Sequence, residues 1–231
     1  MLKVEKITKK FGEIRALNGV SFNVSRGEIL GIIGPNGAGK TTLFSIISGF
    51  LKPDSGDIKL NGRSIVGKKP NQLVKMGLVR TFQIIRVFKH MTVEENVEVA
   101  NFNGRTSEIL KSIGLWNKRN MLARNLSQGE LRRLSIGMAL ATNPKILLLD
   151  EPFSGLSPKE AEDLDRIIRE LNENGITQII IEHKLKELFN LAERVLVLNF
   201  GKVIFEGSPD EAVRNEDVIR AYLGSVRHVK G

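Results

Sequence analysis

The chain has 231 residues, of which 41% are hydrophobic and 26% charged, and 35 Lys and Arg against 26 Asp and Glu give a formal charge of +9. This composition excludes a disordered chain, and the length predicts one large α/β domain or a core with a smaller subdomain attached. The lack of cysteine excludes disulfides and thiolate metal sites.

No apolar run approaches the ~18 residues that a spanning helix needs, and the start MLKVEKITKKF lacks the apolar stretch of a signal peptide. We therefore expect a protein of the cytoplasm. The positive charge suits nucleic acid, an anionic membrane or phosphate ligands, but Lys and Arg are spread along the chain. We interpret the charge mainly as a solvated surface and expect no specific nucleic-acid partner.

Two kinds of strand are predicted. Leu2 and Val4, and later the alternating run from Val20 to Val24, predict strands at an antiparallel edge, and Asn61-Gly62 predicts a hairpin turn. Short, continuous apolar runs bounded by turn signals instead predict central parallel strands that are covered on both faces. These runs are EILGIIG at 28–34, KILLLD at 145–150 and TQIIIE at 177–182.

Helices are predicted between the central strands: after Gly39, from Ser127 to about Thr142, and from Pro158 to about Asn174. Strands that alternate with helices in this way predict a doubly wound α/β core.

The segment from about His90 to Asn125 contains no buried-strand run. A capping box spans Thr92 to Glu95, and a second short helical pattern lies near 107–114, so we expect a helical insert here. Another capping box at Ser208 predicts a closing helix.

The stretch GPNGAGKTT fits the phosphate-loop pattern in full, after a buried strand and at the start of a helix. Glycines let backbone N–H groups turn inward and cradle phosphates at a helix N-terminus. Lys40 is expected to neutralise β- and γ-phosphate charge, and Thr41 to ligate Mg²⁺. A merely tight glycine turn is disfavoured by the combined spacing. The predicted nucleotide-binding residues of this loop are Gly34, Pro35, Asn36, Gly37, Ala38, Gly39, Lys40, Thr41 and Thr42.

Polar residues follow the other central strands. Asp150 and Glu151 end the strand ILLL, at the sheet edge where ligands of such folds bind, so Asp150 is expected to hold the metal through water and Glu151 to polarise the attacking water. Gln83 follows LVRTF and His183 follows IIIE. Their position at the same edge predicts contact with the γ-phosphate, the metal or the water.

The set of motifs at 34–42, Gln83, 126–130, 146–151 and His183, in this order, resembles the nucleotide-binding subunit of ABC transporters over nearly the whole chain. The resemblance implies ATP and Mg²⁺ as ligands, Phe11 stacked on adenine, and Gln83 in the loop that senses the membrane subunit and as a metal ligand beside Thr41 and Asp150. It further implies Glu151 as the general base and His183 as the γ-phosphate switch. Phe11 could alternatively be a core aromatic beside a strand.

The implied fold is a P-loop NTPase core with a parallel central sheet, an antiparallel β fringe and a helical subdomain. We expect residues 1–89 and 145–231 to form the nucleotide-binding core with its β subdomain, and residues 90–144 the helical subdomain. Within the family, stretches such as RTFQIIRVFKHMTVEENVEVA and IIIEHK are similar to the ATP-binding subunits of branched-chain amino-acid importers. Gln128, where Gly is usual, and Ser157, where Asp is usual, depart from the general pattern but fit this group.

The stretch LSQGE begins with a capping box between Ser127 and Glu130, yet places Gly129 in the first helical turn at a cost of ~1 kcal/mol relative to Ala. The helix start at LSQGE is a second helix N-terminus suited to an anion. Within one chain it cannot readily reach the triphosphate bound by the phosphate loop, because the helical insert separates the two. A head-to-tail pair could place Ser127, Gln128, Gly129 and Glu130 of one copy over the γ-phosphate of the other, which gives two identical composite sites.

The sequence therefore predicts an ATPase that works as a homodimer, or as a heterodimer with a second ATP-binding subunit, on the inner face of the cell membrane beside permease subunits. Import of branched-chain or other hydrophobic amino acids is the expected transport. The alternatives are another transporter, for example of lipid or lipopolysaccharide, and a non-transport ATPase that acts on nucleic acid or the ribosome. A nucleotide-binding module without turnover is disfavoured because Glu151 and His183 are both present.

Overall fold

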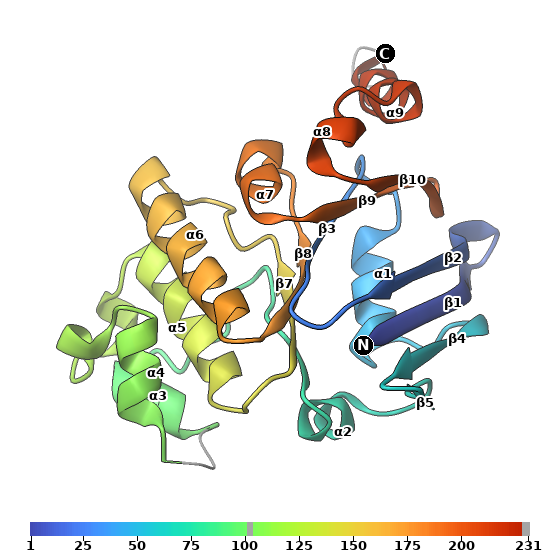
Figure 1. The fold of residues 1–231 in the computed structure, drawn as a ribbon. Coiled ribbons are helices and arrows are strands. Elements are labelled where there is room, and N and C mark those ends of the chain that lie inside the picture. The colour runs from blue at the N-terminus through green and yellow to red at the C-terminus, as the bar shows by residue number, and fades with distance from the viewer. Residues whose placement is uncertain (101–103, 228–231) are drawn as a thin grey trace.

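The computed structural model describes residues 1–100 and 104–227, with side chains described to residue 222. Two sheets and a set of helices make up this part of the chain (Figure 1). The strands are β1 (Leu2–Phe11), β2 (Ile14–Val24), β3 (Ile29–Ile33), β4 (Ser55–Leu60), β5 (Arg63–Ser64), β6 (Leu78–Arg80), β7 (Ile146–Asp150), β8 (Thr177–Ile181), β9 (Arg194–Asn199) and β10 (Lys202–Gly207). The α-helices are α1 (Lys40–Ile47), α2 (Pro70–Lys75), α3 (Val93–Glu98), α4 (Thr106–Ser112), α5 (Gln128–Leu140), α6 (Pro158–Glu173), α7 (Leu185–Leu191), α8 (Pro209–Ala212) and α9 (Glu216–Arg227).

The larger sheet has the strand order β10-β9-β3-β8-β7-β6 and is parallel except for β10. Its central strands β3, β7 and β8 are the three predicted from continuous apolar runs, and every residue in them is buried. Helices cover both faces, which is why these strands lack the alternation of a half-exposed strand. The prediction of a central parallel sheet is confirmed.

The smaller sheet is antiparallel, with the order β2-β1-β4-β5. The predicted alternation is observed, since Leu2 pairs with Val24 and Val4 with Phe22, and all four side chains are buried. The hairpin between β4 and β5 turns at Asn61 and Gly62, which have φ of 50° and 81°. Positive φ at both turn positions is the conformation that Asn-Gly favours.

Side-chain alternation in the central strands divides the main core into two layers. Leu30 and Ile32 point to one face, where they pack with α1 and the antiparallel sheet. Ile29 and Ile33 point to the other face, toward α6 and α7 (Figure 1). The parallel sheet is thus the middle layer, and its carboxyl edge is fixed by packing on both sides.

A third apolar cluster lies among α3, α4 and α5, between β6 and β7 in the sequence. The two capping-box starts predicted for this region and for α5 are present, at Thr92 and Ser127. We propose residues 90–144 as a helical subdomain, because these helices bury a cluster of their own.

The sequence did not predict α2, α7 or the separation of the C-terminal segment into two helices. The predicted closing helix begins at its cap Ser208, but α8 ends at Ala212, and α9 starts afresh after Asn215, whose side chain accepts from the backbone N–H groups of Asp217 and Val218. Asn215 therefore provides a second helix start that the sequence analysis missed.

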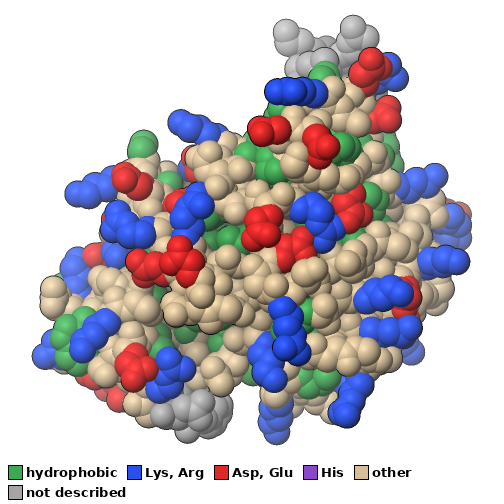
Figure 2. Space-filling view, in the orientation of Figure 1, with side chains coloured by type: hydrophobic (Ala, Val, Ile, Leu, Met, Phe, Trp, Pro, Cys, Tyr) green, Lys and Arg blue, Asp and Glu red, His purple; other side chains and the backbone are tan. Residues whose placement is uncertain are grey.

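None of the helices in the described part of the chain combines the length and hydrophobicity needed to cross a membrane. On the face shown in Figure 2, Lys and Arg side chains are spread over the whole outline of the molecule, with Asp and Glu side chains among them. This distribution agrees with the interpretation of the +9 charge as a solvated surface.

Candidate functional site

The phosphate loop joins β3 to α1 and has the tight backbone that the glycine spacing predicts. Gly34 has a φ of 150° and Gly39 a φ of 104°. A Cβ on Gly34 would lie 2.1 Å from the carbonyl oxygen of Leu198, and one on Gly39 would lie 2.5 Å from that of Ala16. Only glycine fits at these two positions, so neighbouring strands hold the loop in a fixed shape.

Lys40 is the first residue of α1 and lies across the loop. Its ammonium donates to the carbonyl oxygens of Gly34, at 2.7 Å, and Pro35, at 3.0 Å. Burial lowers the pKa of the Lys40 ammonium, while the negative charges of Glu151 and Asp150 oppose that shift. The chain thus carries a largely buried cation beside two carboxylates, at the N-terminus of a helix whose amides attract anions.

The loop forms one wall of a hollow of about 470 Å³. Its other walls include Phe11, at the end of β1, together with Glu151 and His183. Half of the Phe11 side chain is exposed, so Phe11 is an open aromatic surface rather than a core residue. The volume and the mixture of an aromatic ring with convergent polar groups suit a nucleotide.

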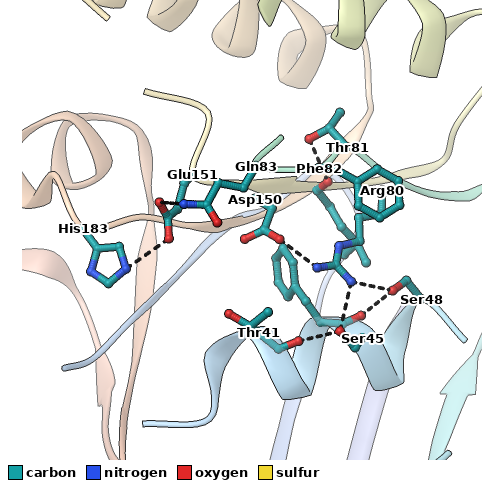
Figure 3. A network of polar contacts seen from close by, with 12 residues as sticks. Thr41, Ser45, Ser48, Arg80, Thr81, Phe82, Gln83, Asp150, Glu151 and His183 are labelled. Atoms are coloured by element: carbon teal, nitrogen blue, oxygen red, sulfur yellow. Dashed lines mark hydrogen bonds and ion pairs between the residues drawn. The ribbon is translucent and has the colours of Figure 1, made fainter. Parts of the chain in front are cut away.

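The three predicted catalytic residues are in contact, because Gln83 and His183 both bind the carboxylate of Glu151 (Figure 3). The side-chain amide of Gln83 donates to Oε2 of Glu151 at 2.8 Å, and Nε2 of His183 lies 3.1 Å from Oε1. The Glu151 backbone has a φ of 48°, in the left-handed region that a Glu residue rarely adopts. Such conformations persist where the surrounding structure enforces them and gather at functional sites.

Asp150 makes a separate contact, with Arg80 of β6 (Figure 3). The Arg80 guanidinium donates to Oδ2 of Asp150 at 2.7 Å, and both side chains are 7% exposed. The other terminal nitrogen of Arg80 contacts the hydroxyls of Ser45 and Ser48 on α1, at 3.3 and 3.2 Å. Through Arg80, these contacts tie Asp150 to the last turn of α1.

Glu182, directly after β8, joins the two loops that carry the predicted catalytic residues Glu151 and His183. Its carboxylate accepts from the backbone N–H groups of Phe153, His183 and Lys184, at 2.6, 2.9 and 3.1 Å. Burial raises the pKa of the Glu182 carboxyl despite these three donors. Glu182 therefore ties the loop after Glu151 to the loop that carries His183.

The stretch LSQGE starts α5 as predicted. The Ser127 hydroxyl accepts from the backbone N–H of Glu130, and the Glu130 carboxylate accepts from that of Ser127. In addition, Oε1 of Glu160 lies 3.1 Å from both the Ser127 hydroxyl and the Gly129 backbone nitrogen. A carboxylate of α6 thus occupies the anion-binding start of α5, and a Cβ on Gly129 would lie 2.6 Å from it.

Within the part of the chain that the structure describes, none of residues 127–130 lines the hollow at the phosphate loop. The structure therefore brings together the phosphate loop, Phe11, Glu151 and His183, with Gln83 joined through Glu151, but it leaves the LSQGE segment apart from them.

The predicted metal ligands offer oxygen donors, from the Thr41 hydroxyl, the Asp150 carboxylate and the Gln83 side-chain amide. Oxygen is the donor that Mg²⁺ prefers, so the donor set fits this ion. Among the described residues, no group of three or more His, Cys, Asp or Glu could hold a metal by itself. A magnesium ion would therefore depend on phosphate oxygens as well as on these residues, which is its usual mode of binding at phosphates.

Four residues with contacts at this site were missed by the sequence analysis: Arg80, Arg132, Glu160 and Glu182. Arg132 of α5 is buried and donates through Nη1 to the carbonyl oxygens of Phe82 and Gln83. Of these four residues, only Glu182 could have been found from its neighbours in the sequence, because it is a charged residue that directly follows an apolar strand. The other three act through partners 31 to 70 residues away in the sequence.

Two family models match this chain. Residues 17–154 match the family model of the ABC transporter, and residues 202–228 match that of the branched-chain amino acid ATP-binding cassette transporter. The chain is 41% identical to the high-affinity branched-chain amino acid transport ATP-binding protein LivG of Salmonella typhimurium, over 97% of this chain and 98% of the relative. It is 39% identical to the corresponding protein BraF of Pseudomonas aeruginosa, with the same coverage.

Solved structures give the same result. An ATP-binding cassette of an ABC transporter in its ADP conformation superposes with a TM-score of 0.91 at 36% identity, over 97% of this chain and 98% of that one. A nucleotide-free cassette gives 0.89 at 35% identity, over 96% and 98%. The predicted family and fold class are confirmed, and the importer group is favoured over the other transporters and non-transport ATPases considered above. This chain belongs to the ABC transporter family, as an ATP-binding subunit homologous to those of branched-chain amino-acid transport.

Proposed function

We propose that this chain hydrolyses ATP to ADP and phosphate, with Glu151 as the general base. The observation that carries the proposal is the Glu151 carboxylate, bound by Gln83 on one oxygen and by His183 on the other at the hollow formed by the phosphate loop. Water attacks the γ-phosphorus, its proton passes to Glu151, and the bond from the γ-phosphorus to the β–γ bridging oxygen breaks. His183 and Gln83 orient the base and the water.

Charge neutralisation supplies the rest of the catalysis, since phosphoryl transfer depends on positioning and electrostatics rather than on covalent intermediates. Lys40 and the amides of the phosphate loop would contact the β- and γ-phosphates, and Phe11 would stack on the adenine. Bound Mg²⁺ would neutralise phosphate charge, and Thr41, Asp150 and Gln83 are the residues that would hold it.

Substitution of the base tests the reaction. Glu151→Gln should lower the steady-state ATPase rate by about 100-fold or more, since a general base contributes 10²–10⁴-fold, while the affinity for a fluorescent ATP analogue stays within twofold. Glu162→Gln, an exposed carboxylate on α6, is the matched control and should hydrolyse ATP normally. Unchanged hydrolysis by Glu151→Gln would mean that another group activates the water.

We further propose that two copies, or this chain and a second ATP-binding subunit, form composite sites in which Ser127 and Gly129 of one copy bind the γ-phosphate held by the other. Support comes from the separation of residues 127–130 from the phosphate-loop hollow of the same chain. Solved relatives include a dimeric bacterial ABC transporter cassette, 30% identical with a TM-score of 0.78 over 90% of this chain and 99% of that one.

The test of the composite site uses Ser127→Arg and Gly129→Asp. Each should leave ATP binding by the monomer intact while abolishing ATP-dependent dimerisation in light scattering and turnover in the ATPase assay. Ser107→Arg, at an exposed position of α4, introduces the same side chain away from this surface and should dimerise normally. If the Ser127 and Gly129 variants turn over at the normal rate, LSQGE is only a helix start.

The loop that follows β6 and carries Gln83 is called the Gln83 loop. The permease subunits are proposed to dock beside it. Phe50, Ile84 and Phe88 are 55%, 77% and 49% exposed, and the Phe50 ring lies 5.5 Å from that of Phe82. Exposed apolar side chains of this size beside a catalytic loop are suited to a protein partner. Docking there would keep the chain at the inner face of the cell membrane.

Purification of tagged chain from native membranes tests this surface. The wild-type chain should recover integral membrane subunits, and Ile84→Asp with Phe88→Asp should lose them. As a control, Val213→Asp replaces a residue on the C-terminal segment that is 52% exposed, and this variant should still recover the membrane subunits. Recovery of DNA with a steep salt dependence, in place of membrane subunits, would instead support the nucleic-acid alternative.

The transported substrate is proposed to be a branched-chain amino acid. Support comes from the similarity to LivG and BraF, which are branched-chain amino acid transport ATP-binding proteins, and from the family match at 202–228. Uptake of radiolabelled leucine by cells that lack the chain should be restored by the wild type and not by Glu151→Gln. Restoration of leucine uptake by Glu151→Gln would contradict the proposal that ATP hydrolysis by this chain energises leucine transport.

A further inference from the structure

Arg132 is the only arginine of α5 that reaches the Gln83 loop in the described part of the chain. Its side chain leaves the second turn of the helix, and its Nη1 donates to the carbonyl oxygens of Phe82 at 3.1 Å and Gln83 at 3.0 Å. The residue is 3% exposed. Helix α5 and the Gln83 loop are therefore joined by a buried, two-point contact.

Burial and nearby carboxylates act on the charge of Arg132 in opposite directions, and burial has the larger effect. Burial lowers the pKa of the guanidinium, and the carboxylates of Glu182, Glu151 and Asp150 oppose that shift. The Nε atom is buried and has no hydrogen-bond partner among the described residues. A buried guanidinium with an unpaired nitrogen is costly for folding alone, which points to a role in the site.

We propose that Arg132 is a positioning residue that couples the two composite sites of the dimer. The inference rests on the proposed function, because it needs Ser127 to act on the nucleotide of the partner. Ser127 caps the helix that carries Arg132, and five residues of helix separate them by only about 7.5 Å. Any shift of Ser127 toward the partner's nucleotide therefore moves Arg132 as well.

A chain of contacts leads from Arg132 to Glu151, the proposed general base in the site of the same chain. Arg132 binds the main-chain oxygen of Gln83, and the Gln83 side-chain amide binds Glu151 at 2.8 Å. One chain thus contributes Glu151 to its own site and Ser127 to the partner's site, and Arg132 lies on the path between them. Occupancy of one site would set the orientation of Gln83 and Glu151 in the other, so hydrolysis should be cooperative in ATP.

The neighbouring Arg133 provides a matched control. It lies on the same helix, and its Nη1 donates to carbonyl oxygens of Ile113 and Gly114, at 3.3 and 3.5 Å, inside the helical insert. Its Nη2 also lies 4.0 Å from Glu130, a carboxylate that Lys118 pairs with as well, so Glu130 keeps a counter-charge when Arg133 is replaced. Substitution of Arg133 removes the same charge from α5 without touching the Gln83 loop.

The experiment compares the dependence of the ATPase rate on ATP concentration for wild type, Arg132→Gln, Arg132→Lys and Arg133→Gln. Two coupled sites allow a Hill coefficient up to 2, so we expect about 1.5 to 2 for the wild type and Arg133→Gln. Arg132→Gln should give about 1, because the Nη1 group that donates to both carbonyl oxygens is lost. Arg132→Lys should lie between, with an ammonium donor in place of the guanidinium.

A purely structural role would change stability but not cooperativity. If Arg132→Gln fails to fold, Arg132→Lys decides by the same criterion, with Arg133→Lys as its control. A wild-type Hill coefficient of 1, a full coefficient in the Arg132 variants, or an equal loss in the Arg133 variant would overturn the proposal. Normal turnover by Ser127→Arg would instead overturn the composite site itself, so the two failures are distinguishable.

Discussion

Replacement of Arg80 by Met isolates the ion pair that holds Asp150. Met keeps an apolar side chain between the rings of Phe44 and Phe82, which lie 5.7 and 5.2 Å from the guanidinium carbon. It removes the donor to Asp150 and the contacts with Ser45 and Ser48. The substitution therefore tests charge and hydrogen bonding more than packing.

The expected magnitude follows from the burial of both partners. With each side chain only 7% exposed, loss of Arg80 leaves a buried carboxylate without its counter-charge, and such a change costs about 3–5 kcal/mol. A domain with a stability of roughly 5–15 kcal/mol would lose a large part of it. In the double variant with Asp150→Asn neither charge remains. Its loss of unfolding free energy should therefore be at least ~2 kcal/mol smaller than the sum of the losses in the two single variants.

Urea unfolding, followed by circular dichroism at pH 7, measures each loss. Arg86→Met is the control, because Arg86 stacks on Phe82 at 4.7 Å but forms no ion pair among the residues described, and its loss should stay below about 1 kcal/mol. The reasoning is refuted if Arg80→Met costs no more than Arg86→Met, or if the Arg80 and Asp150 effects add within ~0.5 kcal/mol.

Three further predictions concern carboxylates. Asn tolerates the left-handed conformation that Glu151 adopts, so Glu151→Asn should be about 1 kcal/mol more stable to urea than Glu151→Gln, although both should be inactive. Equal stability of the two variants would refute the role of backbone strain. On a Glu151→Gln background, Glu160→Gln should lower the ATP concentration needed for dimerisation several-fold, as measured by light scattering. The reason is that the substitution removes the negative charge that Ser127 now contacts, and an unchanged concentration would contradict this. Backbone N–H donors hold the pKa of Glu95, Glu160 and Glu211 below the usual 4.5, so their contribution is complete above pH 4.5 and lost as the pH falls through the folded-state pKa values. A Gln variant at all three should show a flatter acid limb of stability against pH, and an unchanged limb would speak against these caps.

Much of the fold was predictable because its signals are local. The buried strands at 29–33, 146–150 and 177–181 coincide with continuous apolar runs of the sequence, and the capping box at Ser127 involves only four consecutive residues. The phosphate loop needs left-handed and tight backbone at fixed spacing, which glycine alone supplies. Such features do not depend on distant parts of the chain.

The contacts that fix the site were not predictable in the same way. Arg80 pairs with Asp150 across 70 residues, and Arg132 reaches Gln83 across 49. Nothing near either arginine distinguishes it from the many solvated basic residues of a chain with charge +9. Only the order of strands in the sheet and the packing of α5 bring these groups together.

The place of β3 in the central sheet has a consequence for biosynthesis. This early strand leads into the phosphate loop. Among the strands that the structure describes, its partners are β8 and β9, which are made about 150 residues later. At roughly 5–20 residues per second, a ribosome needs about ten to thirty seconds to supply those partners. During that time the nascent chain carries an unpaired apolar strand, and its nucleotide cradle lacks the neighbours that shape it. We therefore expect ATP binding to begin only near the end of synthesis.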